Sequence, residues 1–565
     1  MKASHKHLLA FAVSMVYMVA TLLLVGSCYS INDDRFMGEL LSGAITGNVE
    51  SHLVYVNYLL SLPLSLMYRI STSVPWFGLM LLLFHLLSCF FMLDSFYCKA
   101  KTKKDILVAT ILVAVLFITE IYLITRISYT ITASFMSVAG FVCLILHENK
   151  KLRYGYFIGL ELFAFLLRDK AMLMIVPLGM AVFFGLVLIQ KDETLKTKVI
   201  ETLKACVLLV VILVISFFGN LIGYHGNDWK TFEEYNDART TLFDFSGFPP
   251  YEEVAHILDK YDVSEIDYLA YSNYSIFDYK LNLDCIKELA EYTKGKEQLI
   301  PLSDMLTEYK IKTIWDPYWK TNMVMLAGYI CVILFLAIAG YFRGFIPLVF
   351  LMMTRTVIWI YLLYAGRFPH RISMPLIACE VVLLGTIAYH FYCNGKKTSK
   401  WQNMCFIAIG LLFSGTCLWS GKMQLTELKQ INTVQKTYMQ SFYEITDYCN
   451  ANPDNAYILD TLSFTDFNAS VFDGKIYGKR NFVTPGTWFS NSPAMLKKMN
   501  SYLNNRENGI YFILRSEDAV NHPITQYLAK ETNSTPFICD TIITSYGETY
   551  SVIYFNGILK LNMTP

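Results

Sequence analysis

Long apolar runs recur along this chain and constrain its fold more than any other feature. Each covers about 20 residues, the length that a helix needs to cross the hydrocarbon core of a bilayer. Hydrophobic residues make up 54% of the chain and charged residues only 16%, against roughly 25% charged residues in soluble proteins. The sequence therefore predicts an α-helical polytopic membrane protein with eleven transmembrane helices, over residues 8–28, 74–93, 106–125, 128–146, 154–167, 171–189, 205–223, 322–340, 345–363, 372–392 and 403–420.

The first apolar run follows a basic N-terminus that contains Lys2 and Lys6. A cleaved signal peptide is therefore an alternative to a retained helix. The run is long, and no clear cleavage site between small residues follows it. These features favour a retained first transmembrane helix.

The short turns between the runs indicate how the chain crosses the membrane. Lys and Arg accumulate in cytoplasmic turns, and a chain that starts with a cytoplasmic N-terminus places almost every basic turn inside. A twelfth helix over residues 52–70 would reverse this pattern, so we expect that segment to be a helix or helix pair on the outer membrane face, broken at Pro63. The basic residues predicted inside are Lys99, Lys101, Lys103, Lys104, Lys150, Lys151, Arg153, Lys191, Lys196, Lys198, Lys204, Arg343, Lys396, Lys397 and Lys400.

This topology predicts two domains in the plasma membrane. Residues 1–420 form the transmembrane domain, which includes outer loops over 29–73 and 224–321, and short helices are expected at 252–261 and 285–292. Residues 421–565 form an extracytoplasmic α/β domain with an amphipathic helix at 424–450 and strands at 457–459, 510–514 and 550–555. Function is expected in these outer segments.

Charge and cysteine content exclude two classes of site. The chain has 47 Lys and Arg against 46 Asp and Glu, so it lacks the basic surplus typical of nucleic-acid-binding proteins. Its 13 cysteines show neither the spacing of a zinc site nor a disulfide framework. Membrane lipid is the expected partner, and nucleic acid is not.

An adjacent carboxylate pair, Asp33 and Asp34, follows the first predicted helix at its outer end. Each carboxylate raises the pKa of the other unless a cation or hydrogen-bond donors compensate. Such a pair suits a general base or a metal ligand. A helix cap or a solvated turn is the alternative interpretation.

Basic residues in outer turns run against the usual charge bias of membrane proteins. Arg367 and Arg371 flank a proline between two predicted helices, and Arg168 and Lys170 lie in another outer turn. Guanidinium groups bind phosphate through two hydrogen bonds. Anchoring to lipid headgroups is the alternative for the arginines, and an ion pair with Asp169 is the alternative for Arg168 and Lys170.

Aromatic and polar residues gather in the large outer loop and in the tail. Tyr235, Asn236 and Arg239 lie together in the loop, and Trp488 lies in a turn of the C-terminal domain. Sugar-binding surfaces combine rings for stacking with polar groups for hydroxyls. Packing inside the loop or under the domain is the alternative.

The order of these features resembles the GT-C superfamily of membrane glycosyltransferases. The resemblance covers the whole architecture and is most specific over residues 32–75, with further landmarks at 130–140 and 366–371. Its quoted motifs are Asn32-Asp33-Asp34, Leu41-Ser42-Gly43, Thr46-Gly47, His52 with Tyr55 and Asn57, Leu66-Met67-Tyr68 and Val74-Pro75-Trp76.

The resemblance implies transfer of a sugar from a polyprenyl-phosphate-linked donor to a cell-envelope glycan acceptor, with inversion. It implies that Asp33 or Asp34 is the base or organises a divalent cation, Mg²⁺ or Mn²⁺, and that Arg367, Arg371, Arg168 and Lys170 face the donor phosphate. His52 and Tyr55 would belong to the substrate-binding loop.

Three other functions remain open from the sequence. A transporter or flippase of lipid-linked saccharides would require charges at the bilayer midplane and interrupted helices in paired halves. An oligosaccharide polymerase or ligase would use closely related chemistry. A structural membrane protein with a sensory outer domain would not need the carboxylate pair beside outer arginines.

Overall fold

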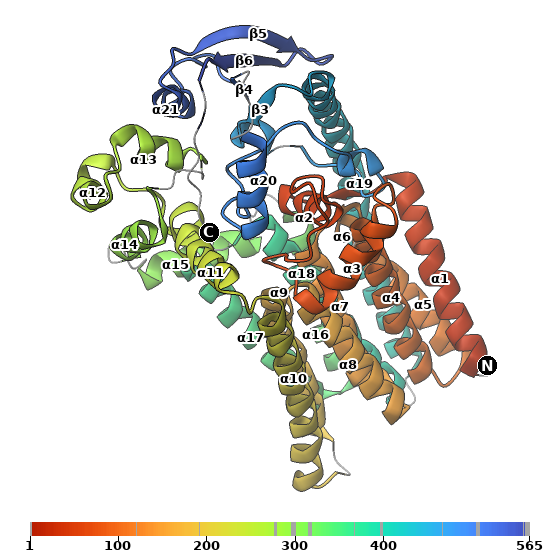
Figure 1. The fold of residues 1–565 in the computed structure, drawn as a ribbon. Coiled ribbons are helices and arrows are strands. Elements are labelled where there is room, and N and C mark those ends of the chain that lie inside the picture. The colour runs from red at the N-terminus through yellow and green to blue at the C-terminus, as the bar shows by residue number, and fades with distance from the viewer. Residues whose placement is uncertain are drawn as a thin grey trace.

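The protein is an α-helical polytopic membrane protein with a mixed α/β domain at one end of its helical bundle (Figure 1). The computed structural model describes residues 3–119, 121–190, 193–275, 280–294, 301–314, 319–366, 368–395, 399–465, 467–503, 509–557 and 559. Across these residues, 9 helices are long and apolar enough to cross a membrane. They are α1 (Ala3–Leu24), α4 (Trp76–Lys99), α7 (Tyr129–Leu146), α9 (Asp169–Ile189), α10 (Leu195–Gly223), α16 (Trp319–Ala339), α17 (Phe345–Tyr364), α18 (His370–Cys393) and α19 (Lys400–Ala451).

Two further predicted spans are helices of the same bundle. α5 (Lys103–Thr119) has only 17 residues and is followed by the short α6 (Ile121–Thr125). α8 (Lys150–Leu167) carries Lys150, Lys151, Arg153 and Glu161 among its 18 residues. α5 packs against α4 and α19, and α8 packs against α7. Each of the eleven apolar runs therefore has its described residues mainly on helices of the bundle, and nine of these helices meet the length and polarity expected of a span.

Burial separates the inner helices from the outer ones. α7 and α18 are almost wholly buried in the middle of the bundle, whereas α1, α10 and α19 expose apolar side chains around it. An apolar surface of this extent is expected to face lipid.

Three of the basic segments predicted inside lie close together, whereas Lys191, Lys396 and Lys397 fall outside the described residues. Lys6 Nζ donates to the Ala100 carbonyl at 2.8 Å, and Lys99 forms an ion pair with Glu148 at 3.5 Å. The N-terminus and the turns after Lys99 and around Glu148 thus share one side of the bundle, as the predicted topology requires. Which side faces the cytoplasm stays a prediction of the positive-inside rule.

The first outer segment folds over the other end of the bundle. Strand β1 (Cys28–Tyr29) pairs in parallel with β2 (Arg126–Ile127), and α2 (Asn32–Ser42) and α3 (Tyr58–Ile70) follow. The break expected at Pro63 is wrong, because α3 continues through it. Asn57 caps α3, and contacts with α2, α8 and α10 hold the helix although an interior proline costs about 3 kcal/mol.

The second outer segment is a helical layer with a small core of its own. The two predicted short helices are confirmed as α12 and α14, and three more helices were not predicted. The elements are α11 (Asn227–Thr240), the π-helical turn η1 (Thr241–Ser246), α12 (Tyr251–Leu258), the 3-10 turn η2 (Asp259–Tyr261), α13 (Glu265–Ser272), α14 (Leu283–Lys294) and α15 (Leu302–Ile314); η3 (Phe342–Gly344) lies between α16 and α17.

The C-terminal domain contains a four-stranded sheet in the order β3-β4-β6-β5. β3 and β4 are parallel and the other pairs are antiparallel. The predicted strands are confirmed, whereas β5 was missed. The elements are β3 (Ala456–Leu459), η4 (Leu462–Phe464), η5 (Gly474–Tyr477), α20 (Pro493–Leu503), β4 (Ile510–Leu514), α21 (Pro523–Thr532), β5 (Phe537–Ile543) and β6 (Thr549–Phe555).

The C-terminal domain is fixed to the bundle in two ways. The expected boundary at 420 falls inside α19, a single helix of 52 residues. The Tyr29 amide donates to the Ala469 carbonyl at 3.0 Å, and the Tyr29 and Tyr477 hydroxyls bond at 3.0 Å. Domain and bundle share one hydrophobic core. The C-terminal domain is therefore packed firmly over α2.

Candidate active site

A cavity of about 900 Å³ lies beneath the C-terminal domain, between the bundle and both outer segments. It collects seven of the sequence-predicted site residues from distant parts of the chain: Asp33, Tyr55, Arg168, Lys170, Arg239, Arg371 and Trp488. Its lining does not include Asp34, His52, Tyr235 or Asn236. Arg367 lies outside the described residues.

Asp33 faces the cavity from the first turn of α2, where the helix dipole favours a negative charge. Its Oδ1 accepts a hydrogen bond from Trp488 Nε1 at 3.1 Å, and its Oδ2 lies 3.7 Å from Arg371 Nη1. Burial raises the pKa of Asp33, and Arg371 and the Trp488 hydrogen bond partly offset this. With 20% of its side chain exposed, Asp33 can meet a ligand.

Asp34 faces the opposite way and joins the starts of two helices. Its Oδ1 accepts from the Tyr129 amide of α7 at 2.9 Å, and its Oδ2 accepts from the Ile31 amide before α2 at 3.3 Å. The side chain is fully buried, and burial raises its pKa to about 7 against the opposing hydrogen bonds. Asp34 therefore corresponds to the helix-cap interpretation of the carboxylate pair.

Besides Arg371, the basic side chains of Arg168 and Lys170 line the cavity near the bundle. The Arg168 guanidinium lies over the rings of Tyr55 at 4.8 Å and Tyr129 at 5.4 Å. Lys170 is exposed, and only its backbone amide bonds to the Asp169 carboxylate, at 2.6 Å. In the part of the chain that the structure describes, neither Arg168 nor Lys170 forms a side-chain ion pair with Asp169, so their charges remain available to a ligand.

The same part of the cavity has an apolar wall. It is built from α9 and α17, which pack against each other, through Leu173, Met174, Pro177, Ile358, Tyr361 and Leu362. Leu173 is 45% exposed and Tyr361 is 66% exposed on the outer surface of the bundle. The cavity therefore borders surface that an acyl or isoprenoid chain can reach from the membrane.

Aromatic rings surround Asp33. Trp488 lies 4.9 Å from the ring of Tyr55 and 5.1 Å from that of Phe36, and both Tyr55 and Trp488 line the cavity. Stacking surface therefore stands beside the carboxylate, as a sugar ring requires.

The predicted residues of the large loop divide between the cavity and its support. Arg239 reaches the cavity and donates from Nε to Asn236 Oδ1 at 3.1 Å, so Asn236 orients Arg239 from behind. Tyr235 bonds to the Tyr271 hydroxyl at 2.8 Å inside the small helical core. Of the three, only Arg239 is placed to touch a ligand in the cavity.

His52 holds the first outer segment to the bundle. Its Nδ1 lies 2.6 Å from Glu50 Oε1, and its Nε2 lies 3.1 Å from the Gly223 carbonyl. Its ring stacks on Trp229 at 3.9 Å. These contacts account for both ring nitrogens and place His52 in the support of the site.

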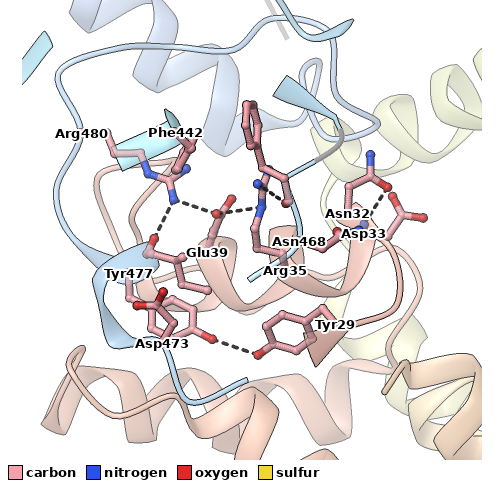
Figure 2. A network of polar contacts seen from close by, with 12 residues as sticks. Tyr29, Asn32, Asp33, Arg35, Glu39, Phe442, Asn468, Asp473, Tyr477 and Arg480 are labelled. Carbon is pink, nitrogen blue, oxygen red and sulfur yellow. Dashed lines mark hydrogen bonds and ion pairs between the residues drawn. The ribbon is translucent and has the colours of Figure 1, made fainter. Parts of the chain in front are cut away.

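Sequence reasoning missed a second group of charges in the cavity. Arg35 and Glu39 of α2 meet Arg480 of the C-terminal domain, as Figure 2 shows. Arg35 directly follows the carboxylate pair, which was a signal of its place near the site. Nothing in the sequence around Arg480 links it to a residue over 400 positions earlier.

The carboxylate pair does not fit a shared metal ion. Asp34 is fully buried, accepts backbone hydrogen bonds on both oxygens and does not line the cavity, so only Asp33 of the pair faces a ligand there. Within the residues that the structure describes, no group of three or more His, Cys, Asp or Glu side chains could hold a metal. The positive charge next to Asp33 comes instead from Arg371 and Arg168.

Comparison with protein-family models finds no match, and comparison with curated proteins finds none either. Among solved structures, the crystal structure of ArnT from Cupriavidus metallidurans bound to undecaprenyl phosphate is similar over 97% of each chain, with 11% sequence identity and a TM-score of 0.39. The identity and TM-score are too low to carry residue roles or an activity to this chain.

Proposed function

We propose that this protein is a GT-C-type membrane glycosyltransferase that moves a sugar from a polyprenyl-phosphate-linked donor to a cell-envelope glycan on the outer face of the plasma membrane. One observation carries the proposal. A single cavity combines a ligand-facing carboxylate, Asp33, with basic side chains and with an apolar wall at the surface of the bundle.

The donor would bind at the end of the cavity next to the bundle. Its isoprenoid chain would lie against α9 and α17, and its phosphate would meet Arg168, Lys170 and Arg371. Cations at this place stabilise the negative charge that develops on the phosphate when the glycosidic bond breaks. Because Arg371 also lies 3.7 Å from Asp33, the phosphate and the base would be neighbours.

Asp33 would act as the general base. Its Oδ2 takes the proton of an acceptor hydroxyl while the acceptor oxygen forms a bond to the anomeric carbon and the bond from that carbon to the phosphate oxygen breaks. Polyprenyl phosphate leaves with the bonding electron pair, and the configuration inverts in this single displacement. The hydrogen bond from Trp488 holds the other carboxylate oxygen and fixes the direction of Oδ2.

One pair of buried charges between two spans bears on the transport alternative. The buried charges Arg355 and Glu380 pair at 3.1 Å between two spans, and Arg355 also donates to the Tyr309 hydroxyl at 2.6 Å. Neither residue lines the cavity. Because these charges satisfy each other inside the bundle, they are not open to a group in the cavity.

The decisive experiment uses the purified full chain and a synthetic polyprenyl-phosphate donor with a radiolabelled sugar. The acceptor is envelope glycan extracted from a strain that lacks this protein. We expect label to pass to the glycan and polyprenyl phosphate to accumulate in equal amount. If the protein moves the lipid across proteoliposome membranes and transfers no label, it is a flippase. Transfer of whole oligosaccharide blocks would identify a polymerase or ligase.

The outward orientation can be tested with a native residue. Cys539 is exposed in the C-terminal domain, so a membrane-impermeant maleimide should label it in intact cells. Cys539→Ser should abolish that labelling. A requirement for permeabilised cells would reverse the orientation.

A further inference from the structure

A compact group of charges lies beside Asp33 under the C-terminal domain. Arg480 Nη2 donates to Glu39 Oε1 at 2.7 Å, and Arg35 Nε lies 3.2 Å from the same oxygen. Arg35 also donates to the Phe467 carbonyl. Both guanidinium groups lie over the ring of Phe442, at 5.2 Å and 5.1 Å. Figure 2 shows this cluster along α2 from Asn32 and Asp33.

The charges of the cluster do not balance. Two arginines face one glutamate, and the exposed fractions of their side chains are only 8%, 7% and 1%. A net positive charge at this depth is costly unless an anion pairs with it. Burial lowers the pKa of Arg35. The negative charge of Glu39 raises that pKa, and the positive charge of Arg480 lowers it.

Arg480 also keeps donors available. Its bonds to Glu39 and to the Ile476 carbonyl, at 2.7 Å and 2.6 Å, both use Nη2. Its Nε and Nη1 have no hydrogen-bond partner among the described residues, and Arg480 lines the cavity. The donors left on Nε and Nη1 lie on different edges of the guanidinium, so each can give a single charged hydrogen bond to an anion in the cavity.

The surroundings of the cluster suit a saccharide. Hydroxyl groups from the C-terminal domain line the same cavity, and they belong to Thr461, Thr465, Thr484 and Thr487. Glu39 follows Asp33 by six residues, which places it about 9 Å further along the axis of α2. An anion held here would lie a short distance from a hydroxyl at Asp33.

We propose that Arg35 and Arg480 bind an anionic group, a phosphate or a carboxylate, on the acceptor glycan. This inference rests on the proposed function and gives it a substrate class, an acidic glycan. The donor phosphate is held separately by cations of the bundle. Glu39 holds the two arginines in place and weakens their attraction for the anion.

The test measures binding of three probes to the full chain in lipid nanodiscs, after saturation with polyprenyl phosphate. The probes are glucose 6-phosphate, glucuronic acid and uncharged methyl glucoside. We expect at least one acidic probe to bind roughly tenfold more tightly than methyl glucoside, as one charged hydrogen-bonded pair implies. The preferred acidic probe identifies phosphate or carboxylate as the group on the acceptor. Equal binding of all three probes would overturn the inference.

Variants separate this role from a merely structural one. Arg480→Lys and Arg35→Lys keep the positive charge but lose the fixed guanidinium donors, so acidic-probe binding should weaken several-fold. Glu39→Gln should strengthen it, because it removes the competing negative charge. A purely structural network predicts the opposite or no change for Glu39→Gln, and that result would refute the inference even if both lysine variants fail to fold.

Arg371→Lys is the matched control for the donor end. It should weaken polyprenyl-phosphate binding and leave acidic-probe binding unchanged. If Arg371→Lys alone weakens the acidic probes, those probes occupy the donor site and the inference fails while the proposed function stands. If polyprenyl phosphate does not bind at all but acidic probes bind through Arg480, the proposed function fails and the anion site remains.

Discussion

Asp33 and Asp34 are neighbours in the sequence, yet they face two regions of opposite character. Asp33 faces a cavity lined by cations and rings, where one carboxylate oxygen can meet a ligand. Asp34 faces the packed junction of α2 and α7, where both oxygens bind backbone amides. Two adjacent carboxylates can therefore have different roles. Here Asp33 faces a ligand, and Asp34 stabilises the helix junction that positions Asp33.

The sharpest test of this division is Asp33→Asn. The amide keeps an acceptor for Trp488 but cannot take a proton from a hydroxyl. Since a general base contributes typically about 10²–10⁴-fold, sugar transfer should fall by on the order of a hundredfold or more, with thermal stability unchanged. Transfer assays and unfolding curves on the same preparation check both parts. Near-normal transfer by a folded variant would remove Asp33 from the chemistry.

The next largest effect is expected at Arg371, which links Asp33 to the donor end. A charged hydrogen bond is worth roughly 1.5–3 kcal/mol, so Arg371→Ala should weaken apparent donor affinity by about tenfold or more. Arg371→Lys should lose less. Arg343 is an exposed arginine in η3 that does not line the cavity, and its replacement by Ala is the control. Identical donor dependence in Arg371→Ala and Arg343→Ala would mean that Arg371 only anchors lipid headgroups.

Asp34→Asn should show the reverse pattern to Asp33→Asn. Its new amide nitrogen would face a backbone N–H, and an unsatisfied buried group costs about 1–3 kcal/mol. We expect lower thermal stability with most transfer activity retained by the folded fraction. Loss of transfer without loss of stability would assign the catalytic role to Asp34 instead.

The pH dependence of stability gives a finer test of the junction. Burial raises the pKa of Asp34 from 3.8 to about 7 in the folded state, so the folded protein binds this proton more tightly than the unfolded chain. The contribution of Asp34 is thus fully present below the unfolded pKa and is lost as pH rises from about 4 to 7. Unfolding curves across this range should show a decline in the wild type that is reduced in Asp34→Asn.

The smallest expected effect concerns metal. Because Asp34 is fully buried and does not line the cavity, chelation with EDTA should change transfer by less than about twofold, well below what loss of a catalytic cation costs. Restoring Mg²⁺ or Mn²⁺ after chelation is the control. A strong loss that Mn²⁺ reverses would require a metal ligand beside Asp33.

The sequence predicted the membrane part of the fold well because a bilayer imposes a length and a polarity on each span. The sequence could not distinguish the roles of Asp33 and Asp34, because both lie in the first turn of α2. Only their hydrogen-bond partners in the fold, Trp488 for Asp33 and Tyr129 for Asp34, distinguish them. Strand β5 was missed because nearly all of its residues are exposed, which removes the alternation that marks a half-buried strand. Arg480 was missed because its meeting with α2 depends on the docking of the C-terminal domain.

The unbroken α19 has a consequence for how this chain can vary in length. Each residue of an α-helix adds about 1.5 Å and turns the chain by about 100°. Deleting one residue near the middle of α19 would rotate Arg480 and Trp488 away from α2, whereas removing seven would nearly restore their direction. Removing seven residues would still bring the C-terminal domain closer to the bundle by about 10 Å. The number of residues in α19 thus sets both the orientation of the C-terminal domain and its distance from α2. Insertions should therefore be tolerated far better in the loops of the C-terminal domain than in α19.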